Sequence, residues 1–288
     1  MENHGSTLAV TYCGNTEFRW GQRTYIMGII NMSPDSFSGD GLSDIESARE
    51  QAERFIAGGA DILDIGGEST RPGSQPITLD EELRRVIPII ERLAQEFTLP
   101  ISIDTGKSAV ASRALEAGAG MINDVWGLKQ DPGLARVAAE AGVPIILASN
   151  QRDEPCRGDI MAGDIMAEVI SSLKKSIALA EAVGVAGQNI IIDPGIGFGK
   201  SLEQNLELIR RLAELKVLGR PILLGTSRKS MIGLVLNLPP DQRLEGTAAT
   251  VAIGIAHGAD MVRAHDVKQM ARVCRMSDAI VRGKLSEC

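Results

Sequence analysis

Eight short aliphatic segments alternate along the chain with eight longer amphipathic segments, and this alternation predicts an α/β fold of the (β/α)8 TIM-barrel class. A length of 288 residues is typical of one such barrel. Aromatic residues make up only 3% of the chain, so the core is aliphatic, which suits parallel strands buried on both faces. We therefore expect residues 1–288 to form a single barrel domain. A doubly wound open sheet is the alternative, and eight regular units favour closure.

The barrel strands are expected at the short apolar runs Tyr25–Ile30, Ile62–Ile65, Ile101–Ile103, Met121–Asn123, Pro144–Leu147, Ile190–Ile192, Pro221–Leu224 and Met261–Arg263. The helices are expected between them, at Ile45–Ala57, Asp80–Gln95, Ser108–Ala117, Gly133–Ala141, Asp164–Val183, Leu202–Leu215, Leu244–His257 and Val267–Ile280. Glycines before strands 2, 4, 5 and 8 are expected to end the preceding helices. We expect Thr105 and Asp266 to cap the amino termini of the third and eighth helices.

Two further short strands are expected before the first barrel strand, at Leu8–Tyr12 and Glu17–Trp20. The sequence Cys-Gly-Asn separates them, which indicates an antiparallel hairpin. Residues 1–22 are therefore predicted to form an N-terminal β-hairpin extension. Its expected role is structural, as a lid over the amino-terminal end of the barrel.

Composition narrows the classes of partner. The net charge is −7 and no cluster of Lys or Arg is present, which argues against nucleic acid as a main partner. No apolar run approaches the length needed to cross a membrane, and Met1–Thr7 lacks the apolar region of a signal peptide. The four cysteines form neither a CxxC pair nor a zinc spacing, which fits reduced thiols. A cytoplasmic location is therefore expected.

Polar residues follow nearly every predicted strand. Active sites of such barrels lie at the carboxyl ends of the strands, so we call the segment after each strand its exit. Any one polar residue there is more often a cap or a turn residue. A ring of them is hard to explain by capping alone, and it predicts a small pocket for a polar ligand. The residues of the ring are Asn31, Asp64, Asp104, Asn123, Asp124, Asp193, Ser227, Arg228, Lys229, Ser230, Arg263, His265 and Asp266.

The chemistry of the ring suggests two kinds of ligand. Asp104, Asn123 and Asp193 suit the edge of a nitrogen heterocycle, because a carboxylate accepts two parallel N–H bonds. The alternative is that these residues cap backbone amides. Exits 7 and 8 of barrels often bind phosphate, so Arg263 and His265 are expected to hold an anion. The alternative for Arg263 is an ion pair with a neighbouring carboxylate.

A glycine-rich segment follows the sixth predicted strand. The sequence GIGFGKS resembles a phosphate loop, but Pro194 stands where that motif requires glycine, so we reject it. Asp193-Pro-Gly instead indicates a turn that fixes the aspartate at the end of its strand. The first two exits are unusually long and carry Asp35 and Arg71, which makes them candidate lids. The alternative is that both are plain surface loops.

Six segments, in order, resemble the dihydropteroate synthase family: GIINMSPDSFSGDG, DIGGESTRPGS, SIDTGKSAVASRALEAGAGMINDV, IIDPGIGFGKSLEQNLELI, SRKSMIG and VRAHDV. The resemblance runs from about Asn31 to Val267 and implies a (β/α)8 barrel. It also implies a transferase of folate biosynthesis. Such an enzyme joins 6-hydroxymethyl-7,8-dihydropterin pyrophosphate to 4-aminobenzoate, giving 7,8-dihydropteroate and pyrophosphate, and sulfonamides compete with the aminobenzoate.

The resemblance also implies residue roles, a cofactor and an assembly. Members of the family are usually homodimers, and the apolar faces of the last two helices could serve as the interface. The alternative is that these faces pack on the barrel, as apolar helix faces more often do. The catalytic positions would be Asp35, Arg71 and Lys229. The roles carried over by motif are pterin binding by Asp104, Asn123, Asp193 and Lys229, pyrophosphate binding by Arg263 and His265, aminobenzoate binding by Thr70, Arg71, Phe198 and Ser230, and a Mg²⁺ ligand at Asn31.

Exit 5 departs from the family pattern. Members commonly have Met-His there, whereas this chain has Ala148-Ser149-Asn150. Two rival functions are considered beside the synthase. One is a catalytically silent or altered pterin-binding homologue, which the departure supports. The other is a pterin- or folate-dependent methyltransferase, which would need neither the ESTRPG loop nor Arg263 with His265.

Overall fold

Eight parallel strands form a closed ring in the computed structural model, which describes residues 8–32, 44–69, 75–152 and 164–283. Hydrogen-bonded neighbours run in the order β8-β7-β6-β5-β4-β3-β10-β9. The ring closes between β8 and β9, where Ile192 forms a parallel bridge with Ile222. The Ile192 N–H donates to Pro221 O at 2.9 Å. The predicted barrel is confirmed. The strands are β3 Tyr25–Asn31, β4 Ile62–Gly66, β5 Ile101–Asp104, β6 Met121–Asp124, β7 Ile145–Ala148, β8 Ile190–Asp193, β9 Leu223–Leu224 and β10 Met261–Ala264.

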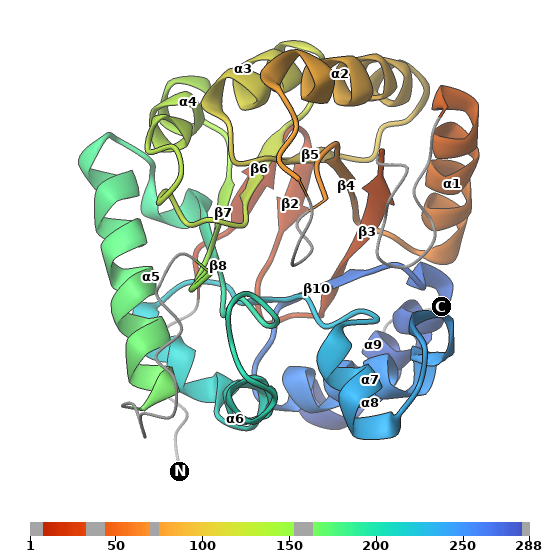
Figure 1. Ribbon diagram of the computed structural model, residues 1–288, viewed down its shortest axis with the longest axis vertical. Helices are drawn as coiled ribbons and strands as arrows, with labels where there is room; N and C mark the ends of the chain where they lie inside the picture. The colour runs from red at the N-terminus through yellow and green to blue at the C-terminus, as the bar shows by residue number, and fades with distance from the viewer. Residues whose placement is uncertain (1–7, 33–43, 70–74, 153–163, 284–288) are drawn as a thin grey trace.

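Helices surround the strands as an outer layer (Figure 1). Each predicted helix is present, and the sixth ends early, at Arg210, where the chain continues as 3-10 turns over Leu212–Leu218. No helix among the described residues is both long and apolar enough to span a bilayer. The helices are α1 Ile45–Gly58, α2 Leu79–Glu96, α3 Ser108–Glu116, α4 Gly133–Ala141, α5 Ile165–Ala182, α6 Leu202–Arg210, α7 Ser230–Leu236, α8 Leu244–Ala256 and α9 Val267–Arg282.

Two predicted caps were wrong in detail. Helix α3 begins after Lys107, not Thr105, because the Thr105 hydroxyl donates instead to the buried carboxylate of Glu82 at 2.6 Å. Asp131 accepts the first helical N–H, from Ser108, at 2.8 Å. Asp266 does lie at the cap position of α9, but its side chain makes no cap hydrogen bond and pairs with Arg228. In both cases a contact distant in sequence displaced the local cap.

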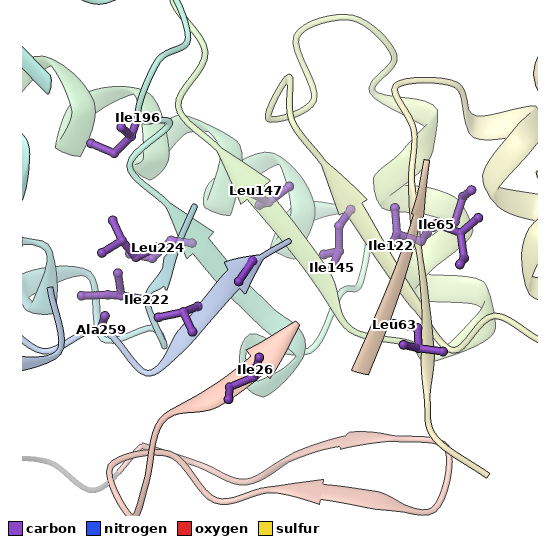
Figure 2. Close-up of a cluster of buried hydrophobic side chains, with 14 of the residues drawn as sticks. Ile26, Leu63, Ile65, Ile122, Ile145, Leu147, Ile196, Ile222, Leu224 and Ala259 are labelled. Carbon is purple, nitrogen blue, oxygen red and sulfur yellow. The ribbon is translucent and has the colours of Figure 1, made fainter. Parts of the chain in front are cut away.

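Side chains alternate between the two faces of the barrel wall. Outward-facing residues of the strands pack against the helices in one large aliphatic layer (Figure 2). Figure 2 shows Leu63 of β4, Ile122 of β6 and Leu147 of β7 in this layer. Inward-facing residues form a second, smaller cluster at the amino-terminal end of the barrel: Tyr25, Met27, Ile62, Met121, Ile146, Ile191, Leu223 and Met261.

The predicted N-terminal hairpin closes this end of the barrel. Strands β1 (Thr11–Cys13) and β2 (Thr16–Phe18) pair antiparallel. Phe18 is fully buried, and its ring lies 4.9 Å from that of Tyr25, centroid to centroid. The Thr11 hydroxyl donates to Gln188 O at 2.5 Å, and the Cys13 thiol donates to Gly120 O at 3.1 Å. The hairpin therefore fills the barrel floor and leaves the carboxyl ends of the strands as the place for a site.

We expect Phe18→Ala to lower the free energy of unfolding by about 3–5 kcal/mol, because it empties a buried aromatic position. Tyr12→Ala is the matched control on the same hairpin, since Tyr12 is 51% exposed, and its effect should stay within about 0.5 kcal/mol. Equilibrium denaturation of both variants tests this. Equal losses of stability would show that the hairpin does not fill the floor.

Candidate active site

The inward-facing residues change from apolar to polar one step above the barrel floor. The period of two along each strand that places Ile62 in the floor also turns Asp64 inward, and the same period turns Asn123 inward above Met121. Strand pairing sets Asn31 opposite Gly66, Gly66 opposite Asp104, and Asp104 opposite Asn123. A buried polar layer therefore lies directly on an aliphatic floor.

Arg263 of β10 links this layer across the barrel. Its Nε donates to Asp64 Oδ2 at 2.6 Å and its Nη2 donates to Asp104 Oδ2 at 2.7 Å. The Asn123 amide donates to the same Asp64 oxygen at 3.0 Å. The ion pair considered as the alternative for Arg263 is thus present. From the sequence, Asp64 has no predicted role beyond membership of the ring, although its spacing of two residues from the inward-facing Ile62 is a signal that identifies it as an interior residue.

Burial sets the ionisation of this layer. It raises the pKa of Asp104 to about 7, against the opposing effect of the Arg263 charge. It raises the pKa of Asp193 as well, and the Lys229 ammonium opposes that rise. Burial lowers the pKa of Lys229 to about 8, partly offset by Asp193. The site therefore holds groups that gain or lose protons close to neutral pH, as expected of a functional site.

Lys229 and Phe198 lie together beside Asp193. The Lys229 ammonium donates to Ile196 O and stands 4.5 Å from the centroid of the Phe198 ring. Asp193 Oδ1 accepts the Gly195 N–H at 2.7 Å, so the predicted turn after Asp193 is confirmed. Gly195 has a φ of +71°, and a Cβ there would lie 1.9 Å from Ser149 O, so this turn requires glycine.

Exit 5, which departs from the family pattern, is an ordered part of the site wall. Ala148 pairs with Asp193 across the β7–β8 register. Beyond it, the Ser149 N–H donates to Asp193 O at 3.0 Å and Lys200 Nζ donates to Ser149 O at 2.7 Å. The Asn150 amide donates to Val125 O at 3.0 Å. These bonds hold exit 5 between exits 4 and 6, so the altered residues keep a fixed backbone with small side chains.

The exits of β9 and β10 meet at Ser227 and His265. The imidazole Nδ1 lies 2.9 Å from Ser227 Oγ, and the His265 backbone N–H donates to the same oxygen at 3.1 Å. Burial, reinforced by the positive charge of Arg263, lowers the pKa of His265 to about 3. The ring is therefore neutral at physiological pH. Any anion beside it would gain a hydrogen bond from His265 and a positive charge from Arg263.

The remaining predicted residues are placed as follows. Asn31 ends β3. A Cβ on Gly66 would lie 3.8 Å from Asn31 Oδ1 and 3.7 Å from Asp104 Oδ2, so the Asn31 amide lies beside Asp104. Ser230 is exposed at the start of α7. Within the described parts of the chain, no group of three or more His, Cys, Asp or Glu residues could hold a metal. The predicted residues Asp35, Thr70 and Arg71 lie outside the described residues.

The structure thus brings six predicted residues together at the carboxyl ends of the strands, with Asn31 beside them. Their arrangement offers hydrogen-bond acceptors and donors for a flat polar heterocycle beside a cationic position for an anion. The six are Asp104, Asn123, Asp193, Phe198, Lys229 and Arg263.

Comparisons with known proteins point to the same kind of ligand. The model of the pterin-binding enzyme family matches residues 27–265. A dihydropteroate synthase of Clostridium beijerinckii is 51% identical and covers 93% of this chain and 98% of its own length. A Clostridium difficile dihydropteroate synthase solved in the presence of pteroic acid superposes with a TM-score of 0.86, at 51% identity, over 92% of this chain and 99% of that one.

A sulfonamide complex of the Yersinia pestis dihydropteroate synthase superposes with a TM-score of 0.89, at 37% identity, over 96% of this chain and all of that one. The family match, these relatives and the polar layer around Arg263 agree. The chain belongs to the pterin-binding enzyme family and, within it, to the dihydropteroate synthases.

Proposed function

We propose that this enzyme joins 6-hydroxymethyl-7,8-dihydropterin pyrophosphate to 4-aminobenzoate and releases pyrophosphate. The observation that carries the proposal is the buried polar layer in which Arg263 bridges two carboxylates beside Asn123, Asp193 and Lys229. Family membership gives this layer its substrate class. The reaction is a transfer to an amine, in which a carbon–nitrogen bond forms, a carbon–oxygen bond to pyrophosphate breaks, and the amine loses a proton.

The pterin would lie on the polar layer with its edges bonded to the barrel wall. Asp193 and Asp104 supply carboxylates for the ring N–H groups, and Asn123 supplies an amide that both donates and accepts. Lys229, held by Ile196 O next to Asp193, supplies a donor for the ring oxygen. The carboxylate of Asp104 also stabilises the positive charge that develops on the pterin as pyrophosphate leaves.

Arg263 and His265 would hold the leaving pyrophosphate at the open end of the barrel. Arg263 neutralises developing negative charge, and burial makes that charge effective because little water screens it. His265, neutral and oriented by Ser227, contributes a hydrogen bond. A nucleophilic side chain is not needed for this chemistry, because the aminobenzoate nitrogen attacks directly.

Mg²⁺ is part of the proposal, with Asn31 as its protein ligand. The fit rests on ligand chemistry: Asn31 offers one amide oxygen at the end of β3, near the Asp104 carboxylate. Mg²⁺ usually keeps several waters and takes its other ligands from substrate phosphates, so one or two protein oxygens suffice. When bound, the ion would reduce the negative charge of the pyrophosphate.

The aminobenzoate would bind beside Phe198 and Ser230, close to Lys229. Phe198 offers an aromatic face, and Ser230 stands exposed at the start of α7. Thr70 and Arg71 on the second exit, and Asp35 on the first, complete this part of the proposal and rest on the family motifs alone. Catalytic roles for Asp35, Arg71 and Lys229 are proposed on the same basis.

A homodimer in the cytoplasm completes the proposal. Helix α8 packs against α7 and α9, and all three expose large apolar side chains. Such a concentration on a surface favours an interface with a second copy. The free thiols of Cys13 and Cys274 support a reducing compartment. The exposed apolar residues are Leu234, Val235, Leu236, Ile253, Met276, Ile280 and Val281.

The proposed reaction predicts pyrophosphate release that requires both substrates and Mg²⁺. Lys229→Ala should weaken pterin binding about 10- to 100-fold, because it removes a hydrogen bond from a charged donor. Arg263→Ala should mainly lower kcat, because it removes the positive charge beside the leaving group. A coupled pyrophosphate assay and pterin titration separate the two effects. Pterin binding without pyrophosphate release would favour the catalytically silent homologue, and unchanged kinetics in both variants would refute the assignments.

The two titrating groups predict a bell-shaped pH dependence for pterin binding. Binding should rise as Asp104 loses its proton around pH 7 and fall as Lys229 loses its proton around pH 8. A pterin alcohol is the suitable ligand, because it carries no titrating pyrophosphate. Asp104→Asn should remove the acidic limb and keep the alkaline limb. An acidic limb that survives in this variant would rule out Asp104 as its source.

The proposed interface predicts that Ile280→Asp converts the dimer to a monomer, because it places a charge in an apolar contact. Ile280 is 71% exposed in one chain, so the substitution should not disturb the barrel itself. Val217→Asp is the matched control, since Val217 is 68% exposed and belongs to the 3-10 segment after α6, not to α7, α8 or α9. Sedimentation velocity distinguishes the outcomes, and a monomeric unaltered chain would contradict the proposal.

A further inference from the structure

Helix α7 has a buried arginine lying across it. Arg243, just before α8, is 9% exposed. Its Nη1 donates to Arg228 O before the helix begins, and its Nε donates to Leu238 O after the helix ends, each at 3.0 Å. Gly233 in the middle of α7 makes room for it, because a Cβ there would lie 2.1 Å from Arg243 Nη2. One guanidinium therefore ties together both ends of this short helix.

The residue held at the start of α7 has an unusual backbone. Arg228 has a φ of +55°, a left-handed conformation that is costly for a residue with a Cβ. The surrounding contacts hold it there. Its N–H donates to Thr247 Oγ1 at 3.1 Å, and its guanidinium donates to both carboxylate oxygens of Asp266, at 2.9 and 2.6 Å. Together with the Arg243 bond to the Arg228 carbonyl, these contacts hold the peptide groups on both sides of the residue.

The left-handed residue stands between two side chains of the site. Ser227, just before it, bonds His265, and Lys229, just after it, reaches Ile196 O and the Phe198 ring. The turn at Arg228 therefore sets the directions of the anion side and the pterin side at once. Loss of the turn would move both without removing either.

We propose that Arg243 is a positioning residue for the reaction: by holding both ends of α7, it maintains the left-handed turn at Arg228 that directs Lys229 and Ser227 into the site. It acts through the backbone of Arg228 and lies at the N-cap position of α8, on the outer layer. Its value for catalysis rests on the proposed function, whereas its effect on Lys229 does not.

Arg243→Met removes both hydrogen bonds and nearly keeps the length of the side chain. We expect the affinity for 6-hydroxymethylpterin to fall about tenfold, because Lys229 loses its fixed direction. We also expect the pKa of Lys229, followed by NMR of labelled lysine without any ligand, to rise from about 8 toward its ordinary value as the side chain leaves its buried position. The NMR measurement tests the positioning role even if the protein binds no pterin.

Three further variants separate positioning from loss of stability. Arg282→Met is the matched control, because Arg282 donates to Ala259 O at 2.9 Å and pairs with Asp278 near the barrel floor. It should lower Tm comparably and leave Lys229 and the pterin affinity unchanged. Gly233→Ala should act like Arg243→Met by displacing the guanidinium, and it replaces that variant if Arg243→Met does not fold. Arg228→Gly, added to Arg243→Met, should recover part of the affinity, because glycine adopts the turn without help.

A Lys229 pKa and a pterin affinity that remain within twofold of the unaltered chain in both Arg243→Met and Gly233→Ala would overturn the proposal. Equal effects from Arg282→Met would overturn it too, since they would reduce the role of Arg243 to general stability. If the unaltered chain binds no pterin while Arg243→Met still shifts Lys229, the proposed function fails and the positioning role stands.

Discussion

The buried ion pairs of Arg263 are the constraint on which the site depends. One guanidinium on β10 reaches past β3 to Asp64 on β4 and Asp104 on β5, and so joins strands that do not pair with β10. Buried charges are tolerated only when they are paired and hydrogen-bonded, and loss of one partner leaves the other uncompensated. The pairs therefore fix where Arg263 points and keep a positive charge inside the barrel. An anionic leaving group can use that charge without a large rearrangement of protein dipoles.

The aliphatic floor makes the polar layer possible. The N-terminal hairpin closes the amino-terminal end with Phe18 and Trp20, so water reaches the charged layer only from the carboxyl ends of the strands. Desolvation is then strong enough to bring the pKa of Asp104 up and that of Lys229 down toward neutrality. Along each strand, alternate side chains face the helices and pack in the core, and the side chains between them face the barrel interior and form the floor and the site. Stability and function thus share strands but use opposite faces.

Much of this arrangement could be predicted from the sequence, because it follows from local periodicity. Short Ile-rich runs located the strands, and polar residues at nearly every strand end placed Asp104, Asn123, Asp193 and Arg263 in one ring. What could not be predicted depends on contacts between distant residues. Helix α7 has only seven residues and needs Arg243 to hold its ends, and Asp64 is central only because Arg263, 199 residues later, reaches it. Thr105 does not cap α3 because its hydroxyl donates a hydrogen bond to Glu82, 23 residues earlier.

The central claim is that the layer around Arg263 is the pterin site of this enzyme. A crystal structure of the chain with a bound pterin tests it most directly. We expect a pterin ring on the polar layer, with its edges bonded to Asp104, Asn123 and Asp193 and with Lys229 near its oxygen. A pterin bound elsewhere, with the Arg263 layer unchanged and out of contact, would contradict the account.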